Sequence, residues 1–179
     1  MIKLEPADII LTKSKKGCIG NLILRTMRAF QKDKVYYQHA ALVVNSKEAI
    51  EALWTVERTK LEERLPNFER YKIIRCPLLG PDRKQAIVKQ AETMLGKKYS
   101  YKRIFFQLLD QIFHTNRFTN GLRTEDEQVC SSLVAWCYEK QTGLKINKLR
   151  WQSVEPDDID DASIKNPAVW KTIYEYRRD

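Results

Sequence analysis

Residues 36–53, YYQHAALVVNSKEAIEAL, constrain the fold most, because they predict two antiparallel strands joined by a tight turn. Two mainly apolar runs flank the polar residues 45–47, a pattern that is typical of a β-hairpin. A polar side chain marks each strand: His39 lies where the first begins, and Glu51 lies within the otherwise apolar second. A sheet that contains this hairpin therefore carries a histidine and a carboxylate whose placement needs an explanation.

The other predicted elements keep strands and helices in separate parts of the chain. Strands are expected at residues 8–12, 71–79 and 168–176. Helices with one apolar face are expected at residues 18–30, 82–96, 101–113 and 129–143. Asp82 is expected to cap the second of these helices and Gly96 to end it. A hairpin early, helices in the middle and a strand at the end indicate the α+β class rather than a regular βαβ series.

Length and composition limit the number of domains and the kinds of partner. The chain has 179 residues, of which 43% are hydrophobic, and this fits a single domain over residues 1–179. Lys and Arg number 32 against 23 Asp and Glu, so the formal net charge is +9. A basic balance can favour nucleic acid or an anionic surface. The basic residues are scattered and form no tail, which argues against a nucleic-acid partner.

The chain shows no obvious export signal, membrane span or metal motif. The apolar run at residues 9–11 is far shorter than the ~7 to 15 apolar residues of a signal peptide. No stretch approaches the ~20 apolar residues of a span, so a soluble, cytoplasmic protein is expected. Four cysteines, without a CxxC pair, are too few and too dispersed for a disulfide scaffold. His39 and His114 show no metal-ligand spacing with them, so no zinc site is expected.

Cys130 is the candidate nucleophile, because of the place that the sequence pattern gives it. A polar loop, residues 117–128, leads into the apolar helix predicted at 129–143, so Cys130 falls in the first helical turn. Free backbone N–H groups and the helix dipole lower a thiol pKa there and stabilise the thiolate. The same N–H groups could face a developing oxyanion. Cysteines are also often ordinary core residues, and Cys137 is interpreted as one.

His39 and Glu51 could complete a site with Cys130 if the hairpin loop has three residues. Glu51 then lies opposite Ala41, on the same face of the sheet as His39 and one step diagonally from it. Such neighbours are ~7 to 8 Å apart at the backbone, within reach of a long side chain. His39 would act as base and Glu51 would orient its ring. A loop one residue longer would put Glu51 on the other face; Glu48, at the turn, is the poorer candidate.

Five segments, in a fixed order, resemble the circularly permuted branch of the NlpC-type, papain-like cysteine peptidases. This branch includes YiiX-like proteins and is related to the lecithin:retinol acyltransferases. The segments are PADIILT (6–12), HAALVV (39–44), IEAL (50–53), LGKKYSY (95–101) and CSSLVAWCY (130–138). Ordinary papain-like enzymes place cysteine before histidine, whereas here His39 precedes Cys130, which is the permuted order. VEPDDI (154–159) is also similar to the proline–aspartate turn of this branch.

The resemblance implies a permuted papain-like fold in which a mainly antiparallel sheet packs against helices. It implies Cys130 as nucleophile, His39 as base and Glu51 as the residue that orients the base. It also implies that Ser131 and Tyr99 bind the substrate. Tyr99 would line the site or donate a hydrogen bond to the oxyanion, although an aromatic residue of the core would give the same pattern.

The chain departs from the pattern of the branch at two places. Ala7 stands where the branch usually has glycine, and Ser131-Ser132 replaces the more usual Ser-Glu after the cysteine. Neither change is expected to abolish the chemistry. The second removes a carboxylate beside the nucleophile and would therefore alter the pocket.

The expected activity is hydrolysis of an amide bond through an acyl-cysteine intermediate. This acyl-cysteine chemistry requires neither a metal nor an organic cofactor. The substrate would be a small peptide or amino-acid amide, which could derive from a cell wall. One alternative is a thiol acyltransferase or lipid thioesterase with the same Cys130 and His39; it would need an acyl channel and a peripheral membrane contact, for which basic residues near YKRIFF (101–106) are available. The other is a non-catalytic basic binding module in which the two residues never meet.

Overall fold

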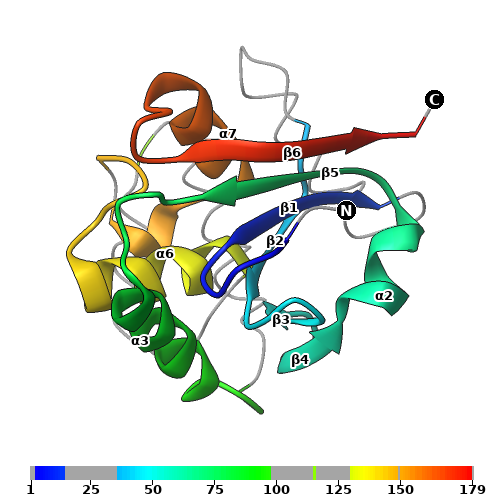
Figure 1. Ribbon diagram of the computed structural model, residues 1–179, viewed down its shortest axis with the longest axis horizontal. Helices are drawn as coiled ribbons and strands as arrows, with labels where there is room; N and C mark the ends of the chain where they lie inside the picture. Colours follow the sequence, from blue (N-terminus) through cyan, green and yellow to red (C-terminus); the bar gives the residue numbers. More distant parts are fainter. Residues whose placement is uncertain (1–2, 15–35, 98–114, 116–129, 149, 179) are drawn as a thin grey trace.

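Six strands form one antiparallel sheet, and its order places the hairpin beside the first strand of the chain. The computed structural model describes residues 3–14, 36–97, 115, 130–148 and 150–178. Along the sheet the strands follow the order β4-β3-β2-β1-β5-β6 (Figure 1). Their bounds are β1 Ile9–Ser14, β2 His39–Val43, β3 Glu48–Ala52, β4 Val56–Lys60, β5 Phe68–Arg75 and β6 Lys171–Arg177.

Two helices, α3 and α6, contact each other and cover one face of the sheet. In Figure 1 α3 (Pro81–Glu92) and α6 (Cys130–Thr142) lie together below β5 and β1. Residues 130–138 of α6 are all buried, because this helix contacts β2, β3, α3 and α7. The other helices among the described residues are α2 Leu61–Arg64, η1 Leu65–Asn67, η2 Trp151–Ser153 and α7 Pro156–Lys165. Among the described residues, no helix has the length and apolarity that crossing a bilayer requires.

The central strand β1 is buried on both faces, and its alternating side chains belong to two separate apolar clusters. Ile9 and Leu11 pack into the larger cluster with α3 and α6. Ile10 points to the other face, where Leu61 of α2 and Ile73 of β5 complete a smaller cluster. Side chains alternate along a strand, so a continuous apolar run such as this one indicates a strand that is covered on both sides.

The segment before β1 departs from ordinary backbone geometry at Ala7. Its φ is 66°, in the left-handed region that favours glycine, which accounts for the glycine that the resemblance led us to expect there. The peptide is held from both sides, because the Ala7 N–H donates to Val43 O at 2.9 Å and Tyr138 Oη donates to Ala7 O. The next residue, the buried Asp8, accepts two hydrogen bonds from Arg75 of β5, at 2.8 and 2.7 Å.

The structure confirms the α+β class and the predicted strand at β1, the hairpin β2–β3, β5 and β6. It also confirms α6, and it confirms α3 except for its end, because α3 stops at Glu92 and not at Gly96. Five described elements were not predicted, namely β4, α2, η1, η2 and α7; the helix α7 begins where only a proline–aspartate turn was expected. The capping prediction for Asp82 is wrong, because Gly80 is the N-cap and Pro81 the first helical residue. The predicted helices at 18–30 and 101–113 and the loop at 117–128 lie outside the described residues.

Candidate active site

The register of the β2–β3 hairpin puts His39 and Glu51 on the same face of the sheet. Glu51 pairs with Ala41, as a three-residue loop requires. The Val44 N–H donates to Glu48 O at 2.9 Å and closes the turn. His39 Nε2 lies 2.6 Å from Glu51 Oε2, so the diagonal step between the two strands is spanned by one short hydrogen bond. The predicted placement of Glu51, opposite Ala41 and within reach of the His39 ring, is therefore confirmed.

Cys130, the first residue of α6, reaches the same histidine from the helical layer. Its buried side chain hydrogen-bonds the ring of His39 and accepts hydrogen bonds from the backbone N–H groups of Ala40 and Ser131. Because Nε2 of the ring faces Glu51, Nδ1 is the nitrogen left for the thiol. A thiol, an imidazole and a carboxylate thus form a continuous chain of hydrogen bonds between α6, β2 and β3.

The electrostatics of this chain favour a thiolate beside an imidazolium. Burial disfavours the thiolate, but the charge of His39, its hydrogen bond and two backbone N–H groups outweigh burial and lower the pKa of Cys130. Burial likewise disfavours a charged ring, but Cys130 and Glu51 together raise the pKa of His39 above its usual value. In contrast, burial alone raises the pKa of Cys137, and burial is the largest cause of the raised pKa of Cys76. Cys130 is therefore the described cysteine that is set up to react.

Glu51 is buried and held by two residues that sequence reasoning missed. Thr59 Oγ1 donates to Glu51 Oε1 at 2.7 Å. Arg64 donates twice, from Nε to Oε1 at 2.9 Å and from Nη2 to Oε2 at 3.0 Å. Burial opposes ionisation of this carboxylate, yet the bonds and charges of His39 and Arg64 prevail and lower the pKa of Glu51 to about 2. Glu51 is consequently a carboxylate across the physiological pH range.

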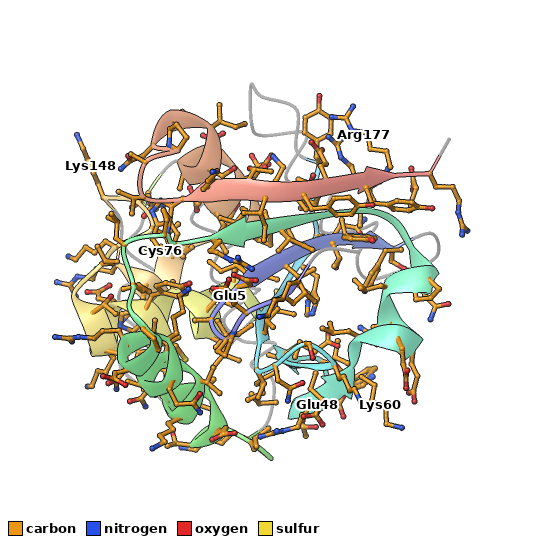
Figure 2. The ribbon with its side chains drawn as sticks, viewed as in Figure 1. Glu5, Glu48, Lys60, Cys76, Lys148 and Arg177 are labelled. Atoms are coloured by element: carbon orange, nitrogen blue, oxygen red, sulfur yellow. The ribbon has the colours of Figure 1, made fainter. Side chains whose placement is uncertain are left out.

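Glu48, the other carboxylate of the hairpin, belongs to the edge of the sheet and not to this cluster. It accepts hydrogen bonds from Asn45 Nδ2 at 2.8 Å and from Arg58 Nη1 at 3.2 Å. Figure 2 shows Glu48 and Lys60 close together at the margin of the molecule, where the two residues are paired across β3 and β4. Glu48 is therefore the first residue of β3, directly after the turn, and its hydrogen bonds go to Asn45 and Arg58 rather than to His39.

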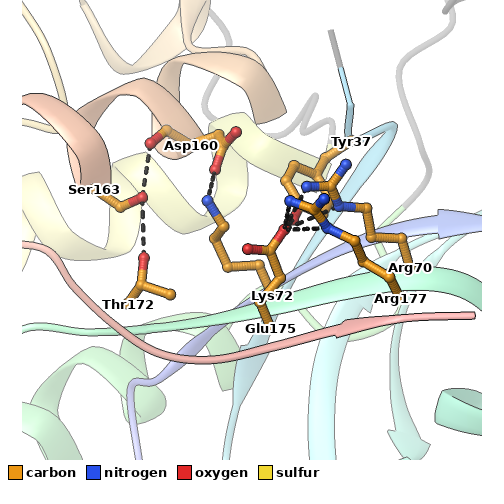
Figure 3. A network of polar contacts seen from close by, with 8 residues as sticks. All are labelled: Tyr37, Arg70, Lys72, Asp160, Ser163, Thr172, Glu175 and Arg177. Atoms are coloured by element: carbon orange, nitrogen blue, oxygen red, sulfur yellow. Dashed lines mark hydrogen bonds and ion pairs between the residues drawn. The ribbon is translucent and has the colours of Figure 1, made fainter.

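A polar network anchors the chain just before His39 (Figure 3). The buried Tyr37 donates from its hydroxyl to Glu175 Oε1 of β6 at 2.9 Å, and Arg70 of β5 donates to the same oxygen. Burial is the main cause of the raised pKa of Tyr37, which therefore stays a neutral donor. Beside it, Lys72 and Asp160 form a buried ion pair between β5 and α7. This network ties the entry of β2 to the far edge of the sheet, two residues from the imidazole.

The structure gives no test of the predicted substrate-binding roles of Ser131 and Tyr99. The buried Ser131 hydroxyl donates to Val154 O at 2.7 Å, so this side chain links α6 to the segment before α7. Tyr99 lies outside the described residues. A role for either residue in substrate binding stays a prediction. Within the described ranges, His, Cys, Asp and Glu form no group of three or more that could hold a metal ion.

Comparison with known proteins agrees with this arrangement. Residues 3–169 match the family described as "Permuted papain-like amidase enzyme, YaeF/YiiX, C92 family". The fold is similar to the crystal structure of the metalloprotein yiiX from Escherichia coli O157:H7, with a TM-score of 0.70 and 18% sequence identity. The alignment covers 99% of this chain and 100% of that one. No curated protein matches the chain. Because the family model spans nearly the whole sequence, the chain belongs to the permuted papain-like amidases of the YaeF/YiiX family, and it is a cysteine hydrolase of the amidase/peptidase type.

Proposed function

We propose that the protein hydrolyses amide bonds with Cys130 as nucleophile, His39 as acid and base, and Glu51 as the residue that orients the ring. One observation carries this proposal: a single imidazole bonds the thiol at the start of α6 and, through its other nitrogen, a buried carboxylate on β3. Family membership supports the class of reaction, and the geometry supports the role of each residue.

In the first half-reaction, the thiolate of Cys130 attacks the carbonyl carbon of the amide and forms a tetrahedral intermediate. The C–N bond then breaks, and the imidazolium of His39 gives its proton to the leaving amine. An acyl group remains on sulfur as a thioester. The first N–H groups of α6 lack partners within the helix and are the natural donors to the oxyanion.

In the second half-reaction, water replaces the amine. The neutral ring of His39 takes a proton from the water as it attacks the thioester carbonyl, and the C–S bond then breaks. The carboxylic acid leaves and the thiolate–imidazolium pair is restored. Glu51 keeps one ring tautomer throughout and stabilises the charged ring, without itself taking a proton.

The substrate class follows from the reaction and is proposed as a small peptide or amino-acid amide. A lipid thioesterase or acyltransferase would use the same pair, but it needs an apolar channel that leads to Cys130. The described residues do form a groove of about 540 Å3, lined mainly by apolar side chains including Leu61, Leu65, Ile73 and Tyr174. None of Cys130, His39 and Glu51 lines this groove, so it gives the lipid alternative no support.

The proposal is tested by competitive alkylation with iodoacetamide, followed by mass spectrometry of each cysteine. Cys130 should be modified much faster than Cys76 and Cys137 at neutral pH, and His39→Ala should remove this difference. The matched control is Cys137→Ser, which changes a thiol in the same helix and should leave the rate at Cys130 unaltered. Equal rates at all cysteines of the wild-type protein would contradict the proposal.

A further inference from the structure

Arg64 binds Glu51 on the side opposite to the imidazole in the hydrogen-bond chain, so it acts on His39 only through that carboxylate. It is the last residue of the short helix α2, whose first residue, Leu61, is buried and donates from its N–H to Lys47 O at 2.8 Å. That contact fixes α2 on the turn of the β2–β3 hairpin. The guanidinium then lies over the ring of Phe68, with 5.5 Å between Cζ and the ring centroid. Both ends of α2 are therefore held while Arg64 reaches Glu51.

The guanidinium binds the carboxylate in a bidentate manner and separates it from solvent. The side chain of Arg64 is 33% exposed, whereas that of Glu51 is 3% exposed. Two parallel N–H···O bonds fix the plane of a carboxylate, which a single bond does not do. With Thr59 on Oε1 and His39 on Oε2, both oxygens of Glu51 are oriented. Arg64, the more exposed partner, therefore helps to fix the position in which the Glu51 carboxylate meets the ring of His39.

The charge of Arg64 has a second consequence for the ring. An isolated buried carboxylate would bind a proton readily, and if ionised it would hold the imidazolium so strongly that the ring could not release its proton. A guanidinium on the same carboxylate opposes both outcomes. The pair of Glu51 and Arg64 has no net charge, so His39 faces an oriented acceptor rather than an uncompensated anion.

We propose that Arg64 is a positioning residue of the active site, which aligns Glu51 through a bidentate ion pair and balances its charge so that His39 can both accept and release a proton. This inference rests on the proposed function. The charged and titratable groups that face Glu51 are His39 of β2 with Cys130 of α6 behind it, Arg64 of α2, and the exposed Glu57, its cross-strand partner on β4.

Two substitutions separate the two roles. Arg64→Gln removes the positive charge and the bidentate hydrogen bonds to Glu51. The charge of Glu51 is then uncompensated and should raise the pKa of His39 by about one unit. The substitution should also slow alkylation of Cys130 at neutral pH by about 3- to 10-fold, because the ring is less well oriented. Arg64→Lys keeps the charge but not the bidentate geometry. Its His39 pKa should stay near that of the wild type, while the alkylation rate still falls.

The NMR titration of the His39 ring has to run from about pH 4 to about pH 12, because the pKa of this ring is already raised to about 10. The iodoacetamide rate at Cys130 is measured over the same range. Arg58→Gln is the matched control: Arg58 is an arginine of β4, its side chain is 36% exposed, and its partners are Glu48 and Glu92. It should change neither property. Thermal unfolding of each variant shows whether the fold is intact.

The outcomes decide between the proposals. If Arg64→Gln matches Arg58→Gln in both properties, or if it lowers the pKa of His39, the inference is wrong. Should Arg64→Gln fail to fold, Arg64→Lys decides, and a wild-type alkylation rate in that variant overturns the positioning role. If Cys130 of the unaltered protein reacts no faster than Cys76, the proposed function itself fails, whatever Arg64 does.

Discussion

His39 Nε2 and Glu51 Oε2 lie 2.6 Å apart, although the two residues are not paired across the strands that carry them. The contact is diagonal, so it depends on a hairpin loop of three residues. Deletion or insertion of one residue in this loop would move Glu51 to the opposite face of the sheet. The length of a surface turn therefore determines whether the imidazole has a carboxylate partner.

The first prediction concerns that partner. Glu51→Gln preserves the shape of the side chain but removes its charge, so the pKa of His39 should fall and the thiolate–imidazolium pair should become less populated. The alkylation rate of Cys130 near neutral pH should drop, but less than in His39→Ala. NMR titration and the pH–rate profile measure both effects. Glu48→Gln is the control, and equal profiles for Glu51→Gln and the wild type would show that the carboxylate is only a strand residue.

Cys130→Ser should keep the fold and lose the hydrolytic activity, because the change is nearly isosteric and a hydroxyl does not ionise here as a thiol does. The charge of Cys130 is the leading cause that raises the His39 pKa, so the ring should also titrate at lower pH in this variant. Circular dichroism and the NMR titration provide the readouts. Unfolding of Cys130→Ser, or survival of an activity established for the wild type, would make Cys130 a structural residue.

Asp157, in the first turn of α7, should limit stability at neutral pH. Burial and then the neighbouring Asp160, Asp161 and Asp158 raise its pKa to about 6. A carboxyl whose pKa is raised in the folded state destabilises the fold as pH rises from about 4 to 6, and the full penalty persists above that range. Asp157→Asn should therefore stabilise the protein by about 1–2 kcal/mol at pH 7, once solvent screening is allowed for.

The chain offers a matched control for that substitution. Asp82 also follows a proline in the first turn of a helix, but it is exposed. Asp82→Asn should be neutral or slightly destabilising, because it removes a charge that favours a helix N-terminus. Urea unfolding at about pH 4 and about pH 7 tests both variants. A gain for Asp157→Asn that is the same at the two pH values would rule out the electrostatic explanation.

Ala7 should tolerate a smaller residue but not a β-branched one. Ala7→Gly removes the steric strain of an alanine in the left-handed region, which is worth about 1–2 kcal/mol. Two effects offset this gain: the unfolded chain becomes more flexible, and a buried methyl group is lost. The net change should stay within about 1 kcal/mol. Ala7→Val should destabilise the protein by more than about 2 kcal/mol, because valine is strained at this φ. Equal unfolding midpoints for the two variants would contradict this account.

Local pattern was sufficient to predict the parts of the site that lie on strongly periodic elements. The hairpin followed from two apolar runs with a polar turn, and this located His39 and Glu51 together. The place of Cys130 followed from the start of an apolar helix. The meeting of Cys130 with His39 depends on the packing of α6 against β2, and it came only from the family resemblance.

The rest of the site was not accessible because its elements have weak patterns. β4, VERTK, carries more charge than apolar surface and has no strand periodicity, so Thr59 was not placed beside Glu51. α2 has only four residues, too few for a helical repeat to be recognised. Arg64 therefore had no assigned element, and no rule of spacing links it to a strand that it meets only in the folded protein.

The order of the elements along the chain also affects when the thiol becomes reactive. His39, Glu51, Thr59 and Arg64 belong to one continuous stretch, residues 39–64, whose contacts are local and can form on the microsecond scale of a hairpin. Cys130 joins them only through a contact between distant parts of the sequence, which is slow to form because loop closure must come first. A newly made chain therefore carries an ordinary thiol until α6 docks on the sheet. Reactivity of Cys130 above that of an ordinary thiol is therefore expected only once α6 is docked on the sheet, and the rate of labelling at Cys130 should report that step.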